Sequence, residues 1–166
     1  MDKATAIKRQ IVTLGDTPID VIKLALEQGL KISYFNPAQS KSTTLESVSG
    51  LLDKKNNTIF VNSTDGPERQ RFTIAHELGH FIYNHDDDKF GLNYRDGTRL
   101  RNSAERQADD FAAEILMPSP IVRKKIKDYS DVSPTLTEIA SLFGVSNKAM
   151  KVRLDKLGLL SAVKIA

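Results

Sequence analysis

Two histidines and a glutamate lie within five consecutive residues near the middle of the chain, in the segment His76-Glu77-Leu78-Gly79-His80. In an α-helix, positions i and i+4 share a face and lie about 6 Å apart along the axis, so both imidazoles can bind one cation. Glu77 can then take a proton from a water held by that cation. The pentapeptide therefore predicts a metal site with a general base, although it also arises by chance on buried helices with two ordinary histidines.

A second pair of chemically suited residues follows 25 positions after His80, in the segment Glu105-Arg106-Gln107-Ala108-Asp109. Glu105 and Asp109 are also one helical turn apart, so their carboxylates share a face. A zinc site built on two histidines and a glutamate takes its third ligand from a second helix, which Glu105 can supply. Asp109 can accept the free N–H of a ligating histidine. Without the upstream motif, a solvated helix face would explain both carboxylates.

The elements that position these residues can be outlined from apolar periodicity and from turn residues. Gly79 costs helix propensity of about 1 kcal/mol against alanine, which predicts close packing of another segment against the metal-binding helix. Helices are expected over 4–14, 18–28, 67–83, 103–117, 120–127 and 147–157, together with one that begins after Ser133 and carries Leu136 to Leu142. Strands are expected over 31–35, 48–52, 58–62 and 159–165.

Composition bounds the class of protein. The 166 residues suit one domain with at most a small appendage, and the chain has no cysteine, so a metal site must use histidine and carboxylate ligands. The N-terminus has no apolar signal core and no apolar run nears membrane length, so we expect a cytoplasmic protein without a membrane partner. Residues 121–166 hold nine Lys and Arg against four Asp and Glu, a net charge of +5. That basic end suits nucleic acid, an acidic partner or a solvated surface.

The strands and the long polar stretch after the metal-binding helix add three expectations. Strand 58–62 can hold an extended peptide by strand addition if it lies at a sheet edge. His85 and the three aspartates that follow it form either a second ion site or a solvated helix end. Tyr94 and Arg95 are candidate donors to a developing oxyanion, with plain surface residues as the alternative.

The C-terminal region has the outline of a helix-turn-helix, two short helices around a turn at Gly144. Such a motif needs base-reading side chains near the start of its second helix, where Asn147 and Lys148 stand, with Lys151 one turn on. A DNA-binding module is thus one interpretation. The other, which we favour, is that this helix pair packs on the rest of the protein or binds a regulator.

The sequence resembles the ImmA/IrrE family of metallopeptidases, over nearly the whole chain. The resemblance is carried by Arg71-Phe72-Thr73-Ile74-Ala75-His76-Glu77-Leu78-Gly79-His80, by Glu105-x-x-Ala108-Asp109-x-Phe111-Ala112-Ala113-x-x-Leu116-Met117-Pro118, and by Phe143-x-Val145-Ser146-x-x-Ala149-Met150-x-x-Arg153-Leu154. It implies a thermolysin-like Zn²⁺ site. His76, His80 and Glu105 would be the ligands, Glu77 the base and Asp109 the partner of a ligand.

The resemblance also implies a fold and a function. The fold would be α+β, with a mostly helical zincin-like metallopeptidase domain at 1–118, a small antiparallel sheet, and a helix-turn-helix-like subdomain at 119–166. The function would be cleavage of an Xre-like or cI-like helix-turn-helix repressor of a mobile element, prophage or stress regulon. Some relatives pair with such regulators in toxin–antitoxin-like modules, so the alternative is a DNA-binding or regulator-binding partner whose output is not proteolysis.

Overall fold

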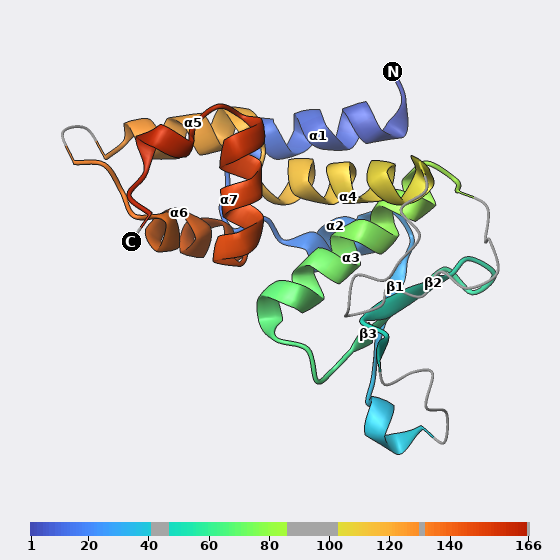
Figure 1. The fold of residues 1–166 in the computed structure, drawn as a ribbon. Coiled ribbons are helices and arrows are strands. Elements are labelled where there is room, and N and C mark those ends of the chain that lie inside the picture. Colours follow the sequence, from blue (N-terminus) through green and yellow to red (C-terminus); the bar gives the residue numbers. More distant parts are fainter. Residues whose placement is uncertain (41–46, 86–102, 130–131, 166) are drawn as a thin grey trace. The chain divides into compact units, whose positions relative to one another are not determined.

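The fold of the protein is described from a computed structural model, over residues 1–40, 47–85, 103–129 and 132–165 (Figure 1). The chain divides into two compact units. Residues 20–112 form the first, which we call the sheet unit, and residues 1–19 with 113–166 form the second, which we call the helical unit. The domain boundary predicted between residues 118 and 119 remains a proposal.

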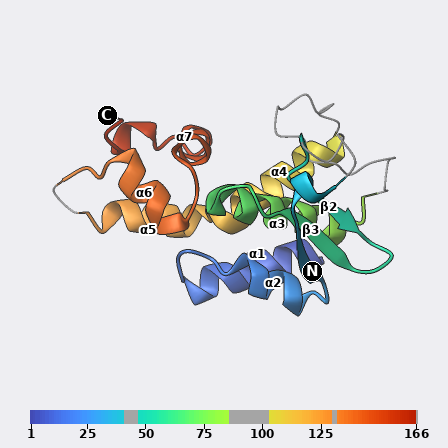
Figure 2. The ribbon, with the colours of Figure 1, turned by 90° about the horizontal axis from the view of Figure 1, so that it is seen from below.

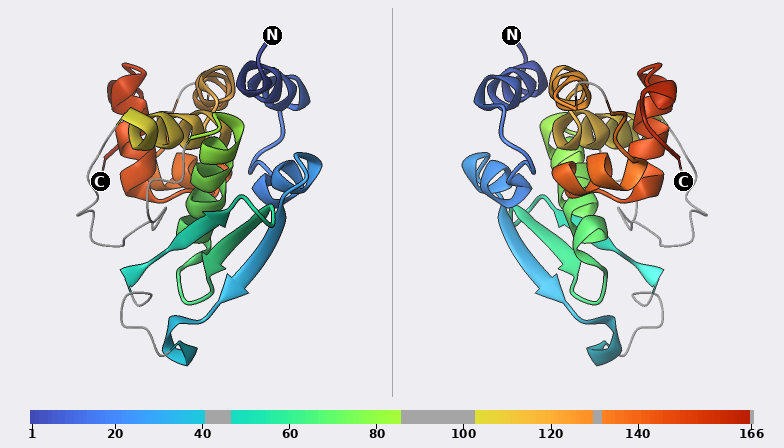
Figure 3. Two further views of the ribbon diagram at one scale, coloured as in Figure 1. Left: turned by 90° about the vertical axis from the view of Figure 1, so that its right-hand side faces the viewer. Right: turned by 90° about the vertical axis from the view of Figure 1, so that its left-hand side faces the viewer.

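A mixed sheet of three strands organises the sheet unit. The strands β1 (Lys31–Phe35), β2 (Gly50–Asp53) and β3 (Thr58–Asn62) lie in the order β1-β3-β2 (Figure 3). The tight turn at Asn57, which has a φ of 49°, makes β2 and β3 antiparallel as expected. The sheet is nevertheless not antiparallel throughout, because β1 pairs with β3 in parallel. The long connection from β1 to β2 imposes no strand direction, which the prediction overlooked.

The central position of β3 removes one expectation. Its backbone is hydrogen-bonded to β1 on one side and to β2 on the other. A strand paired on both sides has no free backbone groups for a further strand. The prediction that 58–62 holds a peptide by strand addition is therefore wrong.

Two helices contact the sheet and each other: α2 (Val21–Glu27) and α3 (Pro67–Ile82). Asp20 caps α2 by accepting the backbone N–H of Lys23 at 2.9 Å, so this helix starts at Val21 and not at the predicted residue 18. Pro67 begins α3, as the sequence predicts for a first helical residue. The middle of α3 is buried on its apolar side, at Ile74, Ala75 and Leu78. A short 3₁₀ helix, η1 (Pro37–Gln39), follows β1.

The helix α4 (Ser103–Leu116) spans the division between the two units. The helical unit also contains α1 (Lys3–Leu14), α5 (Ser119–Lys127), α6 (Leu136–Phe143), α7 (Asn147–Lys156) and the 3₁₀ helix η3 (Leu160–Ala162). The helices α5, α6 and α7 gather in one part of it (Figure 2). Within the described ranges, no helix is long and apolar enough to cross a membrane.

Two details of the helical unit differ from prediction. The helix α6 is capped by Thr135 and not by Ser133, because Thr135 and Glu138 form a reciprocal capping box. The predicted strand at 159–165 is largely absent: η3 lies within it, and its β pairing is a single bridge from Lys164 to Thr135. The chain turns there instead: the backbone N–H of Ala162 in η3 donates to the carbonyl of Leu159, and η3 contacts α7.

Candidate metal centre

The helix α3 buries the first two residues of the predicted site. His76 is 0% exposed and Glu77 is 1% exposed. The helical period places the rings of His76 and His80 on one face, with centroids 4.7 Å apart and their Nε2 atoms 2.9 Å apart. The sequence prediction that one helical turn brings both imidazoles together is confirmed.

The close approach of α4 to α3 depends on Gly79. A Cβ built at this glycine would lie 3.2 Å from the Cα of Ala108 and 3.3 Å from its carbonyl oxygen. A larger side chain would therefore press on the backbone of α4. The tight packing that the sequence predicted at this glycine is confirmed, and it holds the residues of α4 near the two histidines.

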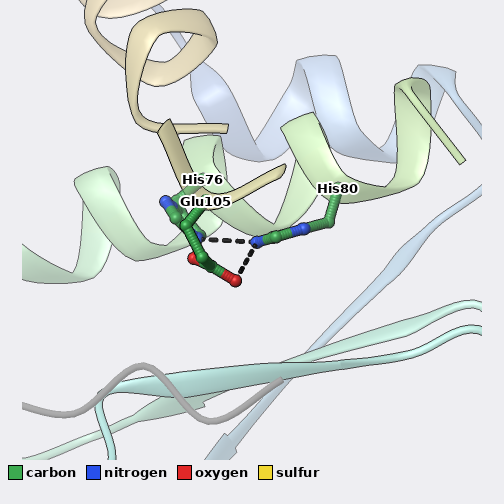
Figure 4. A group of neighbouring side chains, drawn as sticks. All are labelled: His76, His80 and Glu105. Carbon is green, nitrogen blue, oxygen red and sulfur yellow. Dashed lines mark hydrogen bonds and ion pairs between the residues drawn. The ribbon is translucent and has the colours of Figure 1, made fainter. Parts of the chain in front are cut away.

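Glu105 completes a convergent group of three side chains. Its Oε2 lies 3.3 Å from Nε2 of His76, and its Oε1 lies 3.3 Å from Nε2 of His80. The three side chains point toward a common region between α3 and α4 (Figure 4). One ligand atom from each residue lies within 4.8 Å of the others. The structure thus brings together the three residues that the sequence predicted as metal ligands.

Asp109 contacts one of the two histidines, as predicted, and the structure shows that its partner is His76. Its Oδ1 is 2.8 Å from Nδ1 of His76. Because an ionised carboxylate can only accept, Nδ1 of His76 carries the proton and Nε2 of the neutral ring presents its lone pair to Glu105 and His80. Asp109 therefore sets which ring nitrogen of His76 faces the group.

The ring of His85 contacts Nδ1 of His80, as Asp109 contacts Nδ1 of His76. The sequence did not predict this contact. The Nδ1 atoms of the two rings are 2.9 Å apart, and Nε2 of His85 lies 2.8 Å from Oε1 of Gln107. Burial lowers the pKa of His85 below its ordinary value, while the hydrogen bond to Gln107 acts in the opposite direction. His85 is thus half-buried against the candidate metal group and does not only face solvent. The only sequence signal was the asparagine at position 84, a frequent residue just after a helix end.

The geometry of the group fits a divalent metal ion. Bonds of 2.0–2.1 Å in a tetrahedral site put ligand atoms about 3.3 Å from one another, and the distances here are 2.9, 3.3 and 3.3 Å. The lone pairs of two neutral imidazoles and a carboxylate would repel one another at such distances, and a cation among them removes that repulsion. Two imidazoles and one carboxylate also match a known donor set for catalytic zinc.

The remaining predicted site residues fall into two sets. Tyr94 and Arg95, the candidate oxyanion donors, fall outside the described residues, as do the aspartates after His85. Asn147, Lys148 and Lys151 lie on α7 in the helical unit, where all three are exposed. Asn147 donates to Oγ1 of Thr137 on α6 at 2.9 Å.

One cation of α7 has a purely structural contact. The Nε of Arg153 donates to the carbonyl oxygen of Met117 at 2.9 Å. The bond links α7 to the residue that follows α4.

Comparison with known proteins identifies the family. Residues 25–155, most of the chain, match the family described as the IrrE N-terminal-like domain. The chain belongs to the ImmA/IrrE family of metallopeptidases. This confirms the resemblance that the sequence motifs carried, and membership of a metalloprotease family together with the His76, His80 and Glu105 group points to a bound metal ion.

Two relatives in this family and one solved structure show how far the similarity extends. The radiation response metalloprotease IrrE of Deinococcus radiodurans is 38% identical over 99 residues, which are 58% of this chain and 30% of that protein. The metallopeptidase ImmA of Bacillus subtilis is 26% identical over 119 residues, 70% of this chain and 69% of that protein. A solved structure of a Mycobacterium tuberculosis transcriptional regulator covers 92% of this chain and 46% of its own, with a TM-score of 0.58 and 18% identity, which indicates a shared fold alone.

Proposed function

We propose that this protein is a zinc-dependent endopeptidase whose substrate is a helix-turn-helix transcriptional repressor. The observation that carries the proposal is the convergence of His76, His80 and Glu105, with Glu77 next in sequence to the first of them. In this proposal the two Nε2 atoms and the Glu105 carboxylate hold Zn²⁺. Zinc is favoured over magnesium or calcium because imidazole ligands suit it, whereas those ions prefer oxygen alone.

The roles of the chain's own residues follow from their positions. Bound zinc would supply a Lewis acid that polarises the scissile carbonyl and makes water a stronger acid. Glu77 takes a proton from the attacking water and later delivers it to the leaving amine nitrogen. Its burial at 1% exposure shields this proton from bulk solvent. Asp109 fixes the ring of His76, so that its lone pair stays aimed at the metal.

The proposed substrate class rests on family membership and on the regulators that the resemblance implies. An Xre-like or cI-like repressor carries a helix-turn-helix domain, and cleavage of such a protein would relieve repression. We propose that residues 119–166 form a helix-turn-helix-like subdomain, which would contact the regulator. The exposed Lys148 and Lys151 at one end of α7 would supply basic contacts.

A second candidate function follows from the same basic surface. Exposed lysines on α7, within a region of net charge +5, suit contacts with phosphates. In that case the protein would bind DNA or a regulator as the partner in a toxin–antitoxin-like module, without cleavage as its output. The hydrogen bond from Asn147 to Thr137 disfavours it, because a base-reading residue is needed free at the start of the second helix.

Incubation with a candidate substrate tests the proposal. Zinc-loaded protein and the helix-turn-helix regulator encoded beside its gene would be mixed, and the intact masses of both followed over time. The proposal predicts two product masses that sum to the regulator plus one water. Intact regulator after prolonged incubation, with salt-sensitive DNA binding by the full chain, would favour the second candidate instead.

A further inference from the structure

The end of α3 is built so that the chain turns back over His80. The backbone N–H of Asn84 donates to the carbonyl of Phe81 at 3.2 Å, and that of His85 donates to the carbonyl of His80 at 3.1 Å. These two bonds form a Schellman motif, with Asn84 in the left-handed position at a φ of 51°. In this motif the residue after the left-handed one contacts the residue three positions before the cap residue, which is Tyr83 here. Here that pair is His85 and His80.

Several contacts hold the His85 ring and backbone in place. The ring of Tyr83 stacks on His85 with an interplanar angle of 21°, and Phe111 of α4 packs edge-on against Tyr83. Nζ of Lys54, at the end of the β2–β3 hairpin, donates to the carbonyl oxygen of His85. His85 is therefore fixed by α3, by α4 and by the hairpin, although it follows the helix.

The hydrogen bonds define the protonation of both rings. Oε1 of Gln107 accepts, so Nε2 of a neutral His85 donates to it and Nδ1 of His85 must accept. Nδ1 of His80 is then the donor to His85, across 2.9 Å. It follows that Nε2 of His80 bears a lone pair, which faces Nε2 of His76 and Oε1 of Glu105.

We propose that His85 and Gln107 are positioning residues for the metal centre: they hold the ring of His80 with its Nε2 lone pair aimed at the metal. The inference rests on the metal site of the proposed function. It assigns to His80 the kind of support that Asp109 gives to His76. Glu105, Gln107 and Asp109 all lie in the first half of α4. This one helix therefore supplies a metal ligand and also orients both imidazoles, through the contacts of Asp109 with His76 and of Gln107 with His85.

The two supports differ in chemistry. Asp109 is a carboxylate and makes the His76 ring a stronger electron donor, whereas His85 is a neutral relay that ends on an amide oxygen. Loss of the His85 relay should therefore act mainly through ring orientation. A purely structural role for His85, as a packing partner of Tyr83, would leave the metal affinity and the ligand geometry unchanged.

The experiment measures metal binding, independently of cleavage. Zn²⁺ affinity would be determined by competition with a chelating indicator for the wild type, His85→Ala, Gln107→Ala, Gln107→Glu and the double variant of His85→Ala with Gln107→Ala. Gln10→Ala, the same change on an exposed face of α1, is the matched control. Electronic spectra of the Co²⁺-loaded proteins report on ligand geometry, and melting of the metal-free proteins reports on the fold.

The relay predicts a distinct pattern. His85→Ala should weaken zinc binding by roughly 10- to 100-fold, as loss of a ligand's hydrogen-bond partner usually does, and should shift the cobalt spectrum. Gln107→Ala should have a smaller effect in the same direction. Gln107→Glu keeps an acceptor oxygen and should retain most of the affinity, and Gln10→Ala should match the wild type. Because both residues act through one ring, the double variant should lose no more than His85→Ala alone.

Two other results would overturn the inference, and they separate it from the proposed function. Wild-type affinity and an unchanged cobalt spectrum in both His85→Ala and Gln107→Ala would show that the pair does not orient His80, while the metal site itself stands. Failure of the wild type to bind zinc or cobalt would overturn the relay and the proposed function together. Gln107→Ala is exposed on α4, so it tests the relay even if His85→Ala melts early.

Discussion

Substitution of Gly50 by alanine should destabilise the protein, because this glycine lies directly beneath the metal-binding helix. A Cβ at Gly50 on β2 would lie 2.3 Å from Cγ2 of Thr73 on α3 and 2.7 Å from the carbonyl oxygen of Phe60 on β3. Apolar carbons in good contact are about 3.5 Å apart, so Thr73 would have to move by about 1.2 Å. Thr73 is 1% exposed, so its side chain cannot turn out into solvent.

The expected magnitude follows from this overlap. Overpacking of this kind lowers the free energy of unfolding by about 1–3 kcal/mol. Alanine also makes the unfolded chain less flexible than glycine does, which raises the free energy of unfolding by about 0.4–1 kcal/mol. We therefore expect the free energy of unfolding to fall by up to about 2.6 kcal/mol, and the two overlaps, with Thr73 and with Phe60, favour the upper half of that range. Thr73 precedes His76 by less than one helical turn, so the same displacement should also weaken metal binding.

Urea unfolding of the metal-free proteins measures this effect. Gly66→Ala is the matched control, because its φ of −64° is ordinary and a Cβ there meets nothing within 4 Å. Thr73→Ser in the Gly50→Ala background removes Cγ2 and should recover part of the loss, while the contact with Phe60 remains. Stability of Gly50→Ala at or above that of the wild type would refute the close packing of β2 on α3.

Three further predictions concern the ligands, their support and the helical unit. His80→Ala should strongly deplete bound zinc in elemental analysis, and full occupancy would contradict its role as a ligand. Asp109→Ala should weaken zinc affinity or activity by roughly 10- to 100-fold with the fold retained. Unchanged zinc affinity and activity would show that Asp109 does not support the metal site. Hydrogen bonds from Thr135 lower the pKa of Glu138 in the folded protein. The ionised carboxylate therefore stabilises α6 at any pH above the ordinary glutamate pKa. This stabilisation is lost as the pH falls through the lower pKa of the folded state. Glu138→Ala should therefore lower the melting temperature at pH 7, by a difference that shrinks in acid; a constant difference would contradict the capping box.

Much of the candidate site could be predicted because it depends on local helical periodicity. The spacing of His76 and His80 fixes their common face once the segment is a helix, and Gly79 signalled the close approach of α4. The pairing of Asp109 with His76 followed from the chemistry that ligating histidines require. These inferences needed no knowledge of how distant elements pack.

The parts that the sequence did not predict depend on nonlocal pairing. The parallel alignment of β1 with β3 is set by packing across a long connection, and no residue within either strand encodes it. The central place of β3 follows from that alignment. The contact of His85 with His80 was not predicted, because polar residues after a helix normally face solvent. The left-handed turn at Asn84 instead folds this side chain back onto His80.

Glu77→Gln tests the central claim, hydrolysis by a metal site with Glu77 as its base, most directly. The amide is nearly isosteric with the carboxylate but cannot take a proton from water at neutral pH, and the three proposed ligands remain. Peptide cleavage by the zinc-loaded variant would be compared with that of the wild type, with zinc content and melting temperature measured on the same samples. We expect normal zinc content, normal melting and a rate lower by about 10² to 10⁴. A variant that retains zinc, melts normally and cleaves or relieves repression at the wild-type rate would contradict the assignment of this protein as a metallopeptidase.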